Sequence, residues 1–155
     1  NFAFTLAANF NSTEVTKVPA TAQLAALNPA PVLFDRVNVL TFEEGSPDSK
    51  PTGSVDWTRG PFGATIRATR YGEVLSPGTT AALDIELKPR VLVDLEGRWD
   101  VTEKVRVSLG ADNVFDEYPT RLPPLLNSTS NTPFSNYSPY GYSGRFVYLK
   151  ASMNF

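Results

Sequence analysis

The sequence predicts an all-β protein of about six antiparallel strands. Apolar and polar side chains alternate with a two-residue period in each of its longer apolar segments, as expected for strands with one apolar and one polar face. The connections between these segments are alternately short and long. Because alternate connections of an antiparallel sheet lie at opposite edges, one edge is expected to carry tight turns and the other large loops.

The composition restricts the chemistry that this chain can perform. Its 155 residues carry a formal net charge of −2 and include neither His nor Cys. Disulfides, thiolate nucleophiles and His-based catalytic triads are therefore excluded, and the commonest transition-metal ligands are missing. The weak net charge offers no attraction for nucleic-acid phosphates. We expect a protein that is not an enzyme, with no cofactor, no metal site and no nucleic-acid partner.

The positions of the six strands and of two short turns can be read from the sequence. The six expected strands lie at residues 1–11, 54–59, 61–72, 90–101, 104–115 and 144–155. Only "TRGP" lies between Trp57 and Phe62, and only "DVTEK" lies between Trp99 and Val105, so both pairs of strands are expected to form hairpins. The last strand keeps its apolar parity up to a final aromatic residue, although chain ends usually fray. The first residues look like mid-strand sequence without a charged leader, so we expect a piece of a longer protein.

Three long loops hold most of the Pro, Asn and Ser residues. They run over about residues 12–52, 72–89 and 116–143. Loops beyond about 15 residues are uncommon in compact soluble domains, and three of them at one edge favour a binding surface. Within the first loop, the Ala/Leu-rich residues 20–27 predict two helical turns. The residues that follow, 33–50, fit either a brief helix or a strand.

Two architectures fit this alternation of side chains. In a soluble β-sandwich the apolar face covers a core, whereas in a membrane barrel it faces lipid. The placement of aromatic residues separates the two, because amphipathic rings collect at membrane interfaces. An aromatic girdle lies on the apolar parity near the tight-turn edge, formed by Phe2, Phe4, Trp57, Phe62, Trp99 and Phe155. The predicted fold is therefore an antiparallel transmembrane β-barrel segment, and no apolar run is long enough for a membrane-spanning helix.

Several motifs resemble the C-terminal part of TonB-dependent receptors, the outer-membrane transporters of Gram-negative bacteria. The motifs are "LGADNVFDEYPTR" at residues 109–121 and "YGYSGRFVYLKASMNF" at residues 140–155. The segments "RATRYGEV" at 67–74 and "EEGSPDSKPTGSVDW" at 43–57 are similar to the preceding strands and loop of that family. The resemblance implies that residues 1–155 form the C-terminal portion of a larger barrel of roughly 22 strands. The plug domain and the N-terminal strands are expected outside this chain.

The same resemblance implies a function and a set of partners. The protein would be an active importer of the outer membrane that binds a scarce nutrient with its extracellular loops. Ferric siderophores, cobalamin, haem and carbohydrates are the nutrient classes that the family takes up with energy delivered by TonB. The implied partners are outer-membrane lipid, the rest of the barrel and its plug, the TonB complex and the barrel-insertion machinery. Phe155 resembles the C-terminal aromatic residue that this machinery recognises.

The final loop carries the candidate ligand-binding residues, Tyr118, Tyr137 and Tyr140. Their rings suit either stacking on a ligand or packing within the loop. Asp112-Asn113, at the outer end of its strand, suits either capping of the loop or ligand contact. Asp94 and Glu96 form a same-face carboxylate pair like those of glycosidases, but their charged neighbours disfavour hydrolysis.

Two alternative proteins remain open at this point. The first is a soluble β-sandwich that binds carbohydrate, and it predicts a chain that folds in water without detergent. The second is a small complete outer-membrane barrel that acts as an enzyme or adhesin. Because such barrels usually have at least about eight strands, the second alternative needs two further strands.

Overall fold

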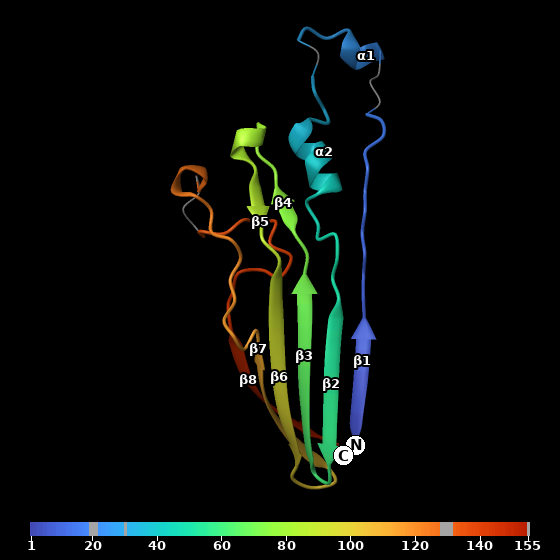
Figure 1. The fold of residues 1–155 in the computed structure, drawn as a ribbon, viewed down its shortest axis with the longest axis vertical. Coiled ribbons are helices and arrows are strands. Elements are labelled where there is room, and N and C mark those ends of the chain that lie inside the picture. The colour runs from blue at the N-terminus through green and yellow to red at the C-terminus, as the bar shows by residue number, and fades with distance from the viewer. Residues whose placement is uncertain (19–21, 30, 128–131, 155) are drawn as a thin grey trace.

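The computed structural model describes residues 1–155 except 19–21, 30, 128–131 and 155. The protein is mostly β, and its main element is a six-stranded antiparallel sheet in the order β1-β2-β3-β6-β7-β8 (Figure 1). These strands are β1 (Phe2–Ala7), β2 (Thr52–Arg59), β3 (Phe62–Tyr71), β6 (Arg90–Asp100), β7 (Val105–Asp112) and β8 (Phe146–Met153). The sheet is open over the described residues, since β1 and β8 each pair with a single neighbour.

Short and long connections lie at opposite ends of the sheet (Figure 1). Arg59 pairs with Phe62, so only Gly60 and Pro61 form the turn between β2 and β3, and Gly60 has a positive φ of 57°. The turn between β6 and β7 spans residues 101–104. Both predicted hairpins are confirmed, and the three long connections all lie at the other end.

The register confirms the predicted faces of the strands. Side chains directly opposite each other in an antiparallel pair point to the same side of the sheet. One apolar row crosses the whole sheet through Phe4, Val55, Ile66, Leu95, Ala111 and Val147. The neighbouring row on the opposite face begins with Thr5, Ser54, Arg67 and Asp94.

The described girdle residues lie together near the short turns. Phe62 stacks on Trp99 with ring centroids 6.3 Å apart, and Phe2 lies opposite Trp57 in the register. Phe2 also stacks on Phe4, with centroids 6.5 Å apart. These rings share the apolar face, as the sequence predicts. Their position at a membrane interface stays a prediction, and Phe155 lies outside the described residues.

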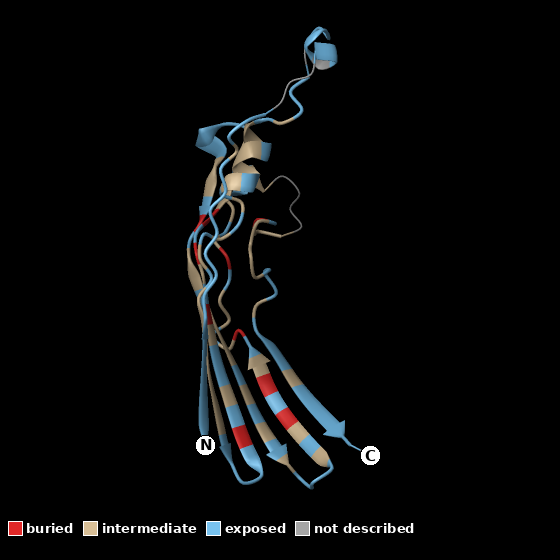
Figure 2. Ribbon diagram, turned by 90° about the vertical axis from the view of Figure 1, so that its right-hand side faces the viewer, coloured by how far each residue is buried: buried red, intermediate tan, exposed pale blue. Residues whose placement is uncertain are grey.

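The apolar face of the sheet is uncovered. Phe4 is 74% exposed, Leu6 88% and Leu149 74%, and exposed residues recur along the strands (Figure 2). The buried hydrophobic residues among those described are Val74 and Leu87, which pair with each other outside the main sheet. In the described part of the chain, nothing packs over the apolar face to form a core.

The long loops contain short elements of their own. Helix α1 (Ala22–Ala25) falls within the predicted helical segment but is shorter. Helix α2 (Arg36–Glu43) resolves the choice between helix and strand, and its N-cap Asp35 accepts a hydrogen bond from the Asn38 N–H at 2.9 Å. None of the helices in the described ranges is long and apolar enough to cross a membrane.

The loop after β3 forms a small hairpin that the sequence did not predict. It pairs β4 (Val74–Ser76) with β5 (Ile85–Leu87) and carries the 3₁₀ turn η1 (Ala81–Leu83) between them. Each strand has only three residues, which is too short for a two-residue period to stand out. The final loop holds a second 3₁₀ turn, η2 (Pro124–Leu126).

Candidate functional site

The polar face of the sheet carries ion pairs between strands. Arg67 of β3 lies directly opposite Asp94 of β6, and its Nη2 is 2.9 Å from Asp94 Oδ2. The other carboxylate oxygen of Asp94 accepts the Asn113 backbone N–H at 2.9 Å. The Asp94 carboxylate therefore links β6 to β3 through one oxygen and to the start of the loop that follows β7 through the other.

A second charged contact passes across a glycine. Arg98 of β6 reaches over β3, where its Nη1 donates to Thr65 Oγ1 at 3.0 Å and lies 3.7 Å from Asp56 Oδ1 of β2. A Cβ at Gly63 would collide with the Arg98 guanidinium group. The absence of a side chain at Gly63 is therefore what lets one arginine connect three strands.

Gly110 leaves space for the side chain of Tyr148, as Gly63 does for that of Arg98. The Tyr148 ring lies where a Cβ at Gly110 would be, and its hydroxyl donates to Glu96 Oε2 at 3.0 Å. With Asp94 engaged by Arg67 and Asn113, both members of the candidate carboxylate pair make structural contacts. This arrangement gives no support to glycoside hydrolysis.

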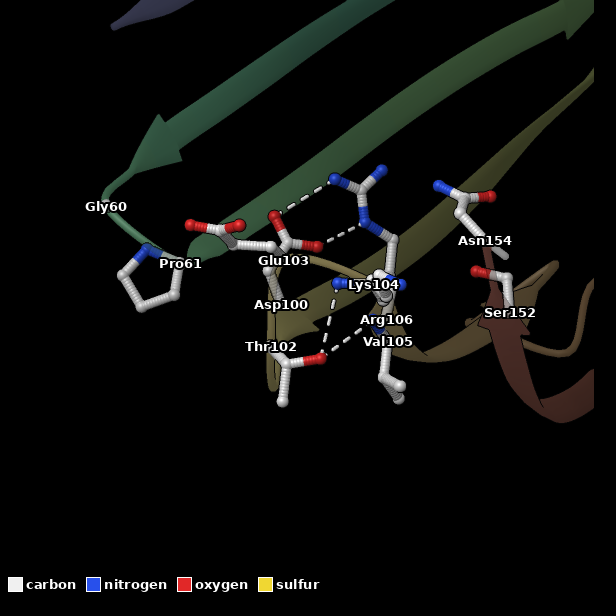
Figure 3. Close-up of a pocket in the computed structure, with 10 residues that line it drawn as sticks. All are labelled: Gly60, Pro61, Asp100, Thr102, Glu103, Lys104, Val105, Arg106, Ser152 and Asn154. Carbon is white, nitrogen blue, oxygen red and sulfur yellow. Dashed lines mark hydrogen bonds and ion pairs between the residues drawn. The ribbon is translucent and has the colours of Figure 1, made fainter.

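The hollow at the tight-turn end is lined mainly by polar residues, some of which bond to one another (Figure 3). The guanidinium group of Arg106 donates to both carboxylate oxygens of Asp100, and the distance from Nη2 to Oδ2 is 3.0 Å. The Thr102 hydroxyl accepts the N–H groups of Lys104 and Val105 at 3.2 and 3.1 Å. These contacts stabilise the turn between β6 and β7, and they engage the side chains of Asp100, Thr102 and Arg106.

Asn113 caps the loop that follows β7. It is buried and has a left-handed φ of 51°. Its side-chain amide donates to the Glu117 carbonyl at 2.8 Å, and its side-chain oxygen accepts the Glu117 N–H at 2.9 Å. The capping interpretation of Asn113 is therefore confirmed, and no contact with a ligand is needed to explain this residue.

Two of the three candidate tyrosines pack against other aromatic rings, one in the final loop and one at the end of β3. Tyr118 stacks on Phe134 with ring centroids 5.6 Å apart. Tyr140 packs on Tyr71 at 5.2 Å, and burial raises the pKa of its hydroxyl above the ordinary value. Tyr118 and Tyr140 therefore contribute to the order of the loops, and a ligand role for them stays a prediction.

Tyr137 has a different position, because it lines a cavity among the loops. The cavity has a volume of about 550 Å³ and lies between α2, the β4–β5 hairpin and the final loop. We call it the loop cavity. Its described lining includes Val37, Ser76, Leu83, Leu122, Ser135 and Tyr137. The final loop's aromatic residues Phe134 and Tyr137 could be identified from the sequence, but the other walls could not, since they come from segments far apart in the chain.

Hydrogen bonds between loops hold the walls of the loop cavity together. Tyr137 shares a hydrogen bond with the Thr41 hydroxyl of α2 at 2.8 Å. Ser135, which is 4% exposed, donates to Ser76 of β4 at 2.9 Å. The final loop is thus tied both to α2 and to the β4–β5 hairpin.

An ion pair ties α2 to the hairpin. Arg36 Nη1 donates to Asp84 Oδ1 at 2.9 Å and to the Gly78 carbonyl at 2.7 Å. The Gly78 N–H also donates to Asp84 Oδ1, at 2.8 Å. The hydrogen bond from Arg36, followed by that from Gly78, lowers the pKa of Asp84 to about 2, and the same pairing raises the pKa of Arg36. Both groups are therefore charged near neutral pH and neutralise each other.

Comparisons of the chain with protein-family models, with curated proteins and with solved structures found no match. Two features of the molecule itself bear on its function. One is the amphipathic open sheet, and the other is the loop cavity at its long-loop end.

Proposed function

We propose that this chain is the C-terminal portion of the barrel of a TonB-dependent outer-membrane receptor. In this proposal the sheet forms part of the channel wall, and the long loops take part in nutrient binding outside the cell. The observation that carries the proposal is the exposed apolar face of a sheet whose other face holds ion pairs. Lipid would cover the first face, and the water-filled interior of the barrel would solvate the second.

The two longest strands have the length of a transmembrane strand. Strands β3 and β6 have 10 and 11 residues, whereas β2, β7 and β8 have 8 each and β1 has 6. A tilted transmembrane strand needs about 9–11 residues. The short turns would lie on the periplasmic side and the long loops outside, which is the usual asymmetry of outer-membrane barrels.

The two edges of the sheet also support a larger barrel. Strands β1 and β8 each have one neighbour among the described residues. Unpaired backbone N–H and C=O groups are costly in lipid, so a membrane sheet has to close on itself. In the proposed protein, both edges pair with further strands of the same barrel.

The soluble β-sandwich remains the alternative, and the exposed apolar face weighs against it. A sandwich needs a second layer over the apolar face. The described residues supply no such layer, and contiguous exposed apolar patches beyond a few hundred Å² are rare on soluble monomers. A binding module of this kind would therefore need a partner to cover the sheet.

Nutrient uptake by cells tests the importer proposal directly. Cells of a Gram-negative host carrying the full-length protein would be supplied with labelled ferric siderophore, cobalamin, haem and oligosaccharides. We expect uptake of at least one of these nutrients, and we expect deletion of TonB to abolish it. Uptake that persists without TonB, or no uptake of any nutrient class, would contradict the proposal.

A further inference from the structure

The loop cavity has the size and the construction of a small-molecule site. Its volume of about 550 Å³ lies within the range of roughly 300–1,000 Å³ that is typical of such sites. Its walls belong to three segments that gather at the long-loop end of the sheet (Figure 1). Hydrogen bonds of Ser135 and Tyr137 join these walls without any ligand. A preformed cavity reduces the ordering cost of binding.

The lining of the loop cavity is uncharged over the residues that the structure describes. Arg36, which donates to the lining residue Gly78, already binds both carboxylate oxygens of Asp84. Arg121 lies over the ring of Phe134, 5.8 Å from its centroid, and is not itself part of the lining. An anionic ligand in this cavity would lose its hydration shell without meeting a positive charge among the described lining residues, which is costly. The cavity therefore disfavours ferric complexes that carry negative charge and favours a neutral ligand.

The lining also combines apolar surface with hydroxyl and amide groups. Val37, Leu83 and Leu122 provide the apolar surface. Ser76 and Asn136 present a hydroxyl and an amide that can both donate and accept hydrogen bonds. Ser76 keeps its own O–H as a donor after accepting from Ser135, and a wholly apolar ligand would use neither this donor nor the Asn136 amide. A sugar ring satisfies both requirements, since its C–H faces are apolar and its rim carries hydroxyl groups.

We propose that the loop cavity binds a neutral saccharide. The inference rests on the proposed function and deepens it by naming the class of nutrient. In the bound state, the saccharide hydroxyls bond to Ser76 and Asn136, and one face of the sugar lies against Leu83. Among the described residues the lining offers no charged partner to an acidic sugar, so a neutral sugar is favoured.

Glycan binding to the purified protein tests this inference. The full-length protein in lipid nanodiscs is applied to an array of neutral and acidic glycans, and gallium citrate serves as an anionic metal complex in a separate titration. Leu83→Trp fills the cavity from η1. The matched control is Leu125→Trp in η2, where the side chain is 96% exposed and does not line the cavity. Unboiled electrophoresis checks that every variant forms a folded barrel.

We expect binding of neutral glycans, with a dissociation constant that rises about tenfold or more in Leu83→Trp and stays unchanged in Leu125→Trp. Binding of acidic glycans or gallium citrate alone, or no glycan binding at all, would overturn the inference. Neutral binding that Leu83→Trp leaves intact would overturn the assignment to the loop cavity. None of these results affects the importer proposal, which TonB-dependent uptake of another nutrient would still support.

Discussion

At the scale of single residues, two glycines decide how the polar face of the sheet is arranged. Gly63 lies beneath Arg98 and Gly110 lies beneath Tyr148, so each long side chain crosses a neighbouring strand at a position without a Cβ. Gly97 is different, because a Cβ there would meet no atom within 4 Å. Glycine in a strand usually costs stability, and these two positions recover that cost through the contacts they permit.

Alanine substitutions at two glycines test this account. Gly110→Ala should push the Tyr148 ring away from Glu96 and destabilise the protein by about 1–3 kcal/mol, as overpacking does. Gly97→Ala is the matched control on the other face, and it should be neutral or stabilising by about 0.5–1 kcal/mol. Urea unfolding of the full-length protein in lipid vesicles measures both changes. Equal effects of the two substitutions would contradict the role of Gly110.

Asn113 provides a second test at this scale. Asn113→Ala removes both side-chain bonds to Glu117 and keeps an unfavourable left-handed φ, so we expect a loss of about 1–3 kcal/mol. Asn113→Gly removes the bonds but relieves the backbone strain, and it should cost less than Asn113→Ala. The same urea experiment ranks the variants. Wild-type stability in both would show that the cap is dispensable.

At the scale of elements, the strands could be predicted and the small loop elements could not. A two-residue period maintained over eight or more positions identifies strands such as β3 and β6 and also fixes which face is apolar. The β4–β5 hairpin is too short for such a period. Helix α2 is also short. It is stabilised by contacts with residues outside the helix, namely those of Arg36 with Asp84 and of Thr41 with Tyr137.

The Arg36–Asp84 ion pair makes the attachment of α2 to the hairpin dependent on pH. Because folding lowers the pKa of Asp84 to about 2 from 3.8, the contribution is present above about pH 4 and disappears as the pH falls toward 2. Pepsin is active over this range. We expect its cleavage within residues 36–43 and 72–89 to accelerate between pH 4 and pH 2.

Two variants complete this experiment. Asp84→Asn should be cleaved rapidly even at pH 4, since it cannot form the ion pair. Glu86→Gln, at an exposed position of β5 two residues away, should behave like the wild type. A cleavage rate in Asp84→Asn that matches the wild type at pH 4 would show that the ion pair does not hold the loops together.

At the scale of the whole molecule, the amphipathic sheet was predictable from the sequence, whereas the loop cavity was not. The sheet follows from side-chain parity, which each strand carries in its own residues. The cavity depends on contacts between α2, the hairpin and the final loop. These segments are far apart in the chain, so no local sequence pattern predicts that they lie together. Of the candidate tyrosines, only Tyr137 lies in the cavity lining, because the ring of Tyr118 packs on Phe134 and that of Tyr140 on Tyr71.

The uncovered apolar face predicts how the isolated chain behaves in water. Residues 1–155 expressed alone should aggregate in buffer and become soluble only with detergent or lipid, because both sheet edges and the apolar face are exposed. Light scattering and size-exclusion chromatography measure this directly. A monodisperse chain that unfolds cooperatively in plain buffer would instead favour the soluble alternative.

Labelling of single cysteines tests the central claim, that one face of the sheet contacts lipid and the other water. The chain has no native Cys, so Leu95→Cys and Leu149→Cys can be compared with Glu96→Cys and Lys150→Cys, their neighbours on the opposite face. The full-length protein is reconstituted in lipid. We predict that a lipid-soluble probe labels Leu95→Cys and Leu149→Cys, and that a water-soluble probe labels Glu96→Cys and Lys150→Cys but not the first pair. If neither probe reaches Leu95→Cys or Leu149→Cys, the apolar face packs against protein and the barrel account is wrong.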